Sequence, residues 1–199
     1  MLSRRWLSVV LICLGATVIA AETVAKSALA VKAEPSCWDV HATLVNHRET
    51  AVWFGCVALV ALVGNLVSDD RKSRFAVIVV PRLGGRVTWW TAKLVAVAVA
   101  AVTVQLLFVL LCLGLGAMHG WTLSPAASRF ATSMWVDPNV RTLFPTTYRG
   151  GGIGHHVLMV GYLGLASTGL AAVVLALSVR FTAGVLPVLL TFVGLVADF

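Results

Sequence analysis

Residues 94–117 read LVAVAVAAVTVQLLFVLLCLGLGA, and Gln105 is the only strongly polar side chain among them. An apolar run of this length can cross the roughly 30 Å hydrocarbon core of a bilayer as an α-helix. Trp89 and Trp90 stand just before the run, where interfacial aromatic residues flank membrane helices. The sequence therefore predicts a membrane-spanning helix over about 89–117.

Further apolar runs lie on both sides of this one. Residues 50–67 carry no charge and would cover about 27 Å as a helix. Residues 157–179 form another long run, and residues 183–197 form a shorter one that contains Pro187. Together with the first apolar run of the chain, the expected spans are about 6–30, 50–67, 89–117, 157–179 and 183–197.

The run that follows Arg4 and Arg5 also has the pattern of a signal peptide, with a basic start, an apolar core and small residues at Ala20 and Ala21. Small and apolar residues continue to Val31, so a helix can extend past the apolar core. We expect the segment to be retained as the first span, with cleavage as the alternative.

The composition agrees with a membrane protein. The chain is 59% hydrophobic and 12% charged, whereas soluble domains carry about 25% charged residues. Lipid accepts such an apolar excess directly, and helices satisfy their own backbone groups within it. We therefore predict an all-α integral membrane protein with a single transmembrane domain over 1–199. The Ala-, Val- and Gly-rich composition favours a bacterial plasma membrane.

The distribution of charge predicts the orientation. With the N-terminus inside, nine of the 15 basic residues and two of the eight acidic residues fall on the inner side, and six of each fall on the outer side. Cytoplasmic loops carry the excess of Lys and Arg, so we expect the N-terminus inside and the C-terminus outside. The inner loop is then 68–88, and the outer loops are 31–49 and 118–156. No basic stripe or motif indicates nucleic-acid binding.

The inner segment 68–95 reads SDDRKSRFAVIVVPRLGGRVTWWTAKLV. Its order of charged start, apolar stretch, proline, basic residues and lysine before a span resembles the cytoplasmic loop between the second and third spans of ABC-2-type transporter permeases. The resemblance implies a short coupling helix between helices 2 and 3 that docks on a separate ATP-hydrolysing subunit. The docking loop would contain Arg71, Lys72, Arg74, Phe75, Pro81, Arg82, Arg86 and Lys93.

The residues themselves fit such a role, because a short segment with an apolar face and a basic edge can lie on the membrane surface and present side chains to a partner. The simpler interpretation is that this loop only fixes the topology. Asp69, Asp70 and Ser73 stand near the places where the family has glutamate and glycine, and five spans are expected where the family has six. The chain would then be a shortened or divergent member.

The resemblance implies a transmembrane subunit of an ABC-type exporter that couples ATP hydrolysis by a separate subunit to movement of an amphipathic substrate, such as a lipid, peptide or glycolipid. The expected partners are an ABC ATPase subunit, which carries the ATP and magnesium, and a second copy or a paralogous membrane subunit. This chain has no phosphate-loop, zinc-protease or serine-hydrolase motif, so we expect neither enzyme activity nor a cofactor of its own. The alternative is a non-transporting membrane scaffold, assembly or sensory subunit of a larger complex, which the scarcity of polar residues in the spans favours.

All five histidines fall on the outer side in this topology. Imidazole and thiolate groups bind zinc and copper, but the spacing of these residues is not diagnostic, and histidines also suit the membrane–water boundary. We therefore expect no metal site, and a membrane enzyme or metal-handling protein is the least favoured alternative. The candidate ligands would be Cys37, His41, His47, His119, His155 and His156.

Overall fold

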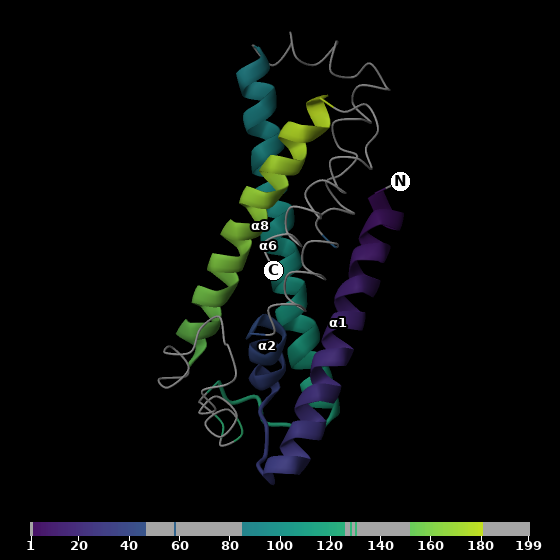
Figure 1. Ribbon diagram of the computed structural model, residues 1–199, viewed down its shortest axis with the longest axis vertical. Coiled ribbons are helices and arrows are strands. Elements are labelled where there is room, and N and C mark those ends of the chain that lie inside the picture. Colours follow the sequence, from purple (N-terminus) through teal and green to yellow (C-terminus); the bar gives the residue numbers. More distant parts are fainter. Residues whose placement is uncertain are drawn as a thin grey trace.

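The computed structural model describes residues 2–46, 58, 85–125, 128, 130 and 152–180. This part of the chain is helical, apart from its turns and an isolated bridge between Ser36 and Thr122. Its helices are α1 (Leu2–Val31), α2 (Cys37–Asn46), α6 (Arg86–Met118) and α8 (Ile153–Arg180), which pack side by side along one long axis (Figure 1).

Helices α1, α6 and α8 are each long and apolar enough to cross a membrane. The prediction of an all-α chain is therefore confirmed for the described residues, and the three long apolar helices are consistent with an integral membrane protein. The three helices coincide with the spans expected over about 6–30, 89–117 and 157–179. The spans expected over 50–67 and 183–197 lie outside the described residues.

Helices α1 and α6 both end in a Schellman motif, in which a residue in the left-handed conformation closes the last turn. At the end of α6, Gly120 has a φ of 74°, and the Trp121 N–H donates to the Gly116 carbonyl at 3.1 Å. At the end of α1, Lys32 takes the same role with a φ of 54°. Because a side chain disfavours this conformation, Lys32 is a less comfortable terminator than the glycine of α6.

Contacts between the helices give their directions. The Cys37 N–H, which follows α1, donates to the Thr122 carbonyl, which follows α6, at 2.9 Å. Helices α1 and α6 therefore finish at the same end of the bundle and run parallel. Helix α8 runs the other way, since its early residue His156 meets α2 and its later residue Gly164 lies near Val102 in the middle of α6.

The largest difference from the sequence analysis concerns residues 37–46, which were predicted to belong to an outer loop. They form helix α2, which lies among the three long helices (Figure 1). Cys37, Val40 and Val45 are all completely buried. The prediction was wrong here because polar residues in this segment are paired inside the bundle and are not turned toward water.

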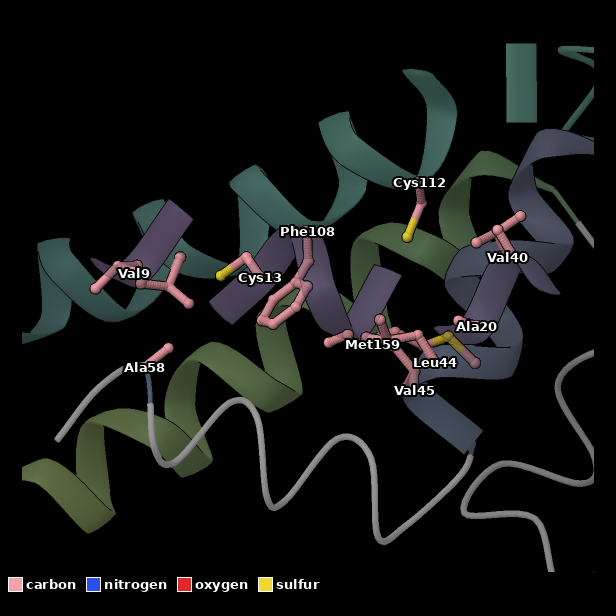
Figure 2. Packing of buried hydrophobic residues seen from close by; sticks show 13 residues of the cluster. Val9, Cys13, Ala20, Val40, Leu44, Val45, Ala58, Phe108, Cys112 and Met159 are labelled. Atoms are coloured by element: carbon pink, nitrogen blue, oxygen red, sulfur yellow. The ribbon is translucent and has the colours of Figure 1, made fainter. Parts of the chain in front are cut away.

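Side chains from all four helices meet in one buried cluster (Figure 2). Cys13 of α1, Phe108 of α6 and Met159 of α8 pack there beside Leu44 and Val45 of α2. The large apolar side chains on the outside of the bundle, such as Leu110 of α6, are exposed as lipid-facing residues would be. The cluster thus makes α2 a central element of the bundle.

Candidate functional site

The buried helix α2 carries the ionisable side chains Asp39 and His41 into an apolar interior. Burying a polar group costs free energy unless it finds a hydrogen-bond partner. Both residues find partners in segments far away in the sequence. The candidate site is built around these pairings.

The imidazole of His156 on α8 lies beside two aromatic side chains of α2. Its ring centroid is 4.5 Å from a Trp38 ring and 5.3 Å from the His41 ring. Trp38 and His41 are three residues apart, so they share one face of the helix. The Nδ1 atoms of His41 and His156 are 3.1 Å apart and form a buried hydrogen bond. One of these nitrogens must donate and the other must accept, so the bond requires at least one ring with a free Nδ1 lone pair.

His41 is completely buried, and its Nε2 atom has no hydrogen-bond partner among the described residues. Burial, followed by the neighbouring His156 and His155, lowers the pKa of His41 from 6.5 to about 3. His41 is therefore neutral at pH 7, because its charged form would lose hydration without gaining a counterion. The ring of His155 lies close by, with its centroid 5.6 Å from that of His156. We call His41, His155 and His156 the histidine cluster.

Asp39 fixes the beginning of α2. Its Oδ2 atom accepts the Ser36 backbone N–H at 2.6 Å and the Ser128 hydroxyl at 2.7 Å. The first bond is one half of a capping box, in which the third helical residue satisfies the N–H of the cap residue. The second bond ties a residue of the segment after α6 to the same carboxylate oxygen.

Residues 121–123, which come just after α6, lie beside the start of α2 and bind it through their carbonyl groups. The Cys37 thiol donates to the Trp121 carbonyl at 3.3 Å, and the Trp38 indole N–H donates to the Leu123 carbonyl at 3.0 Å. Burial raises the pKa of the Cys37 thiol above its ordinary value. The thiol therefore stays protonated, as a hydrogen-bond donor must be.

Helix α6 approaches α2 closely at Gly116. A Cβ atom at this position would lie 2.7 Å from the Cys37 Cα atom, which is well inside van der Waals contact. Glycine is required here for space, since residue 116 is within a regular helix.

The structure brings together three of the six candidate metal ligands. His41, His155 and His156 form the histidine cluster, whereas His119 stacks on Trp121 with centroids 4.8 Å apart. Cys37 bonds to a carbonyl oxygen, as described above, and His47 lies outside the described residues. These three histidines lie close together, but among the described residues no group of three or more His, Cys, Asp or Glu side chains is arranged so that it could hold a metal ion.

Most of the predicted docking loop lies outside the described residues, namely Arg71, Lys72, Arg74, Phe75, Pro81 and Arg82. Arg86 is the first residue of α6. The Lys93 ammonium lies 5.7 Å from the centre of the Trp89 ring, four residues earlier on the same helix, which is a cation–π distance. The docking role of this segment stays a prediction.

A pocket of about 610 Å³ lies between the ends of α1 and α6. Ala28 and Leu29 give it an apolar wall, while Lys32, Glu34 and His119 give it polar groups. Its volume falls within the range of small-molecule sites. The lining of the pocket therefore combines apolar and polar side chains.

The structural roles of Trp38, Asp39 and Ser128 were not predicted from the sequence. A local signal existed for Asp39, because Ser36-Cys37-Trp38-Asp39 has the spacing of a capping box. No local signal exists for Ser128, whose partner is 89 residues away.

Comparison of the chain with protein-family models, with curated proteins and with solved structures finds no match to any of them.

Proposed function

We propose that this chain is the membrane-spanning subunit of an ABC-type exporter and that α6 couples a partner ATPase to the bundle. The observation that carries the proposal is the continuity of α6, which runs unbroken for 33 residues from Arg86 to Met118. Arg86 belongs to the segment that resembles a docking loop, while Gly116 contacts α2 at the far end. Because a helix of this length spans about 50 Å, a push at Arg86 can reach α2 without a flexible joint.

The positions of charged residues support a cytoplasmic location for the Arg86 end. The start of α1 and the end of α8 lie at the same end of the bundle as Arg86, and they carry Arg4, Arg5 and Arg180. The described part of the chain has no acidic residue at this end. The acidic residues Glu22, Glu34 and Asp39 lie toward the other end. This asymmetry is the one that the positive-inside rule associates with a cytoplasmic face.

The pocket between α1 and α6 supports the proposed class of substrate. It places apolar side chains beside Lys32, Glu34 and His119 at the end of the bundle. A lipid, peptide or glycolipid with a polar head and an apolar body would match both parts of this lining.

Affinity purification from native membranes tests the proposal. We expect an ABC ATPase to co-purify with the wild-type chain and to fall at least about tenfold in the Arg74→Glu, Arg86→Glu double variant, because reversed charges at a docking surface repel the partner. The control is Lys32→Glu, which reverses an exposed charge at the opposite end and should retain the ATPase. If wild-type protein retains no ATPase, the exporter function is wrong and a scaffold, assembly or sensory role takes its place.

A further inference from the structure

Helix α8 meets α2 at two neighbouring positions of its first turns. His156 provides the polar contact, through its hydrogen bond to His41 and its ring contact with Trp38. Met159, three residues later, provides the apolar contact in the buried cluster with Leu44 and Val45 (Figure 2). If the polar contact were lost, the beginning of α8 could leave α2 and would expose Met159.

We propose that the histidine cluster is a proton-operated latch, which fastens the first turns of α8 to α2 while the imidazoles are neutral and releases them when they are protonated. The ligand of this site is the proton. The latch is independent of the proposed exporter function, since it needs only the contacts between α2 and α8.

Hydrogen-bond chemistry explains the release. The contact between the two Nδ1 atoms needs one donor and one acceptor, and two imidazolium rings would offer two donors and no acceptor. Positive charges on His41 and His156 would also repel each other, because their ring centroids are 5.3 Å apart. A charged His156 would also repel a charged His155, whose ring centroid lies 5.6 Å from its own. Like charges at such distances in a buried site are strongly unfavourable.

Other titratable groups on the packed elements have contacts of their own. On α2, the Asp39 carboxylate accepts bonds from Ser36 and Ser128, and the Cys37 thiol donates to a carbonyl. At the end of α6, His119 stacks on Trp121. The thiols of Cys13 on α1 and Cys112 on α6 are buried and form no disulfide.

The direction of the effect follows from proton linkage. In the latched state the pKa of His41 is about 3, below the ordinary value of 6.5, and release into water would restore the ordinary value. Below pH 6.5 the released state therefore binds more protons than the latched state, and acidification favours release. Each imidazole freed in this way raises the ratio of released to latched protein up to about tenfold per pH unit, and two raise it up to about a hundredfold.

Hydroxyl-radical footprinting of the full chain in lipid nanodiscs measures the release. Met159 is 1% exposed and Met118 is 84% exposed, so the oxidation of Met159 relative to Met118 reports the opening of α8 within one sample. We expect this ratio to rise at least about tenfold between pH 7.5 and pH 5.0. An unchanged ratio over this range would overturn the proposal without the use of any variant.

Variants identify the groups that bind the protons. His156→Arg should give a high Met159 ratio already at pH 7.5, because the guanidinium places a permanent charge in the cluster, whereas His41→Gln should reduce the steepness of the pH response. His119→Gln is the matched control and should respond as the wild type does, since His119 lies outside the cluster. If His119→Gln removes the response, or if His156→Arg leaves Met159 protected at pH 7.5 with helical content unchanged by circular dichroism, the histidine cluster is not the latch.

Discussion

An alanine at position 116 is expected to destabilise the folded protein by about 3 kcal/mol, at the upper end of the cost of overpacking a core. The new Cβ atom would stand 2.7 Å from the Cα atom and 2.8 Å from the Cβ atom of Cys37. The first of these is backbone, which cannot rotate away as a flexible side chain can. The helices α2 and α6 would have to separate, and the contacts of α2 with its neighbours would weaken together.

Gly114 provides the matched control, because it lies two residues earlier on the same helix and a Cβ atom there meets nothing within 4 Å. Gly114→Ala should leave stability unchanged or raise it by about 1 kcal/mol, the difference in helix propensity between the two residues. Thermal unfolding of both variants in mild detergent, followed by circular dichroism, measures the difference. Equal stability of Gly116→Ala and Gly114→Ala would show that α2 does not approach α6 as closely as the structure places it.

The long helices could be predicted from sequence because their information is local. The run around Gln105 is apolar along its whole length, and an isolated lipid-spanning segment has few alternatives to a helix. Its ends are local as well, since Trp89 and Gly120 stand close to the boundaries that the structure shows for α6. Hydropathy thus indicated where α1, α6 and α8 run.

Helix α2 could not be found in the same way, because the partners that allow its burial are distant in sequence. His41 pairs with a residue 115 positions away, and the Trp38 indole bonds a carbonyl 85 positions away. Read locally, Asp39 and His41 indicate a segment exposed to water. The capping-box spacing of Ser36 and Asp39 could have predicted the start of a helix, but nothing nearby in the sequence predicts that the helix is buried.

The histidines show the same division between local and distant information. The topology predicted that they lie on one side of the membrane, and the structure brings His41, His155 and His156 together at one end of the bundle. The predicted topology could not distinguish these three histidines from His119, which stacks on the Trp121 indole instead. That distinction depends on how α8 packs against α2, which only the fold determines.

Asp39→Ala is the second substitution with a large expected effect, a loss of about 2–3 kcal/mol of stability. The change removes the acceptor of the Ser36 N–H and of the Ser128 hydroxyl in one step. A buried donor left without a partner costs about 1–3 kcal/mol, more than the bond itself contributes.

Asp39→Asn separates the hydrogen bonds from the charge. Both bonds go to the single oxygen Oδ2, so the one carbonyl oxygen of asparagine can accept both, and most of the stability should remain. Bonds to a charged acceptor are stronger than those to a neutral one, which leaves a smaller loss of about 1 kcal/mol. Ser128→Ala, which removes one of the two bonds, should fall between the wild type and Asp39→Ala.

Labelling of Cys37 with a thiol reagent gives a local measure of the same change. Cys37 is the first residue of α2, is completely buried and donates its thiol hydrogen to Trp121. If Asp39 holds the start of α2 in place, Asp39→Ala should speed labelling of Cys37 well before global unfolding, because local opening exposes a buried group at a lower cost than complete unfolding. If Asp39→Ala and Asp39→Asn label Cys37 equally fast, the hydrogen bonds of Asp39 do not hold the start of α2, and the carbonyl groups of residues 121–123 and the close contact at Gly116 must do so.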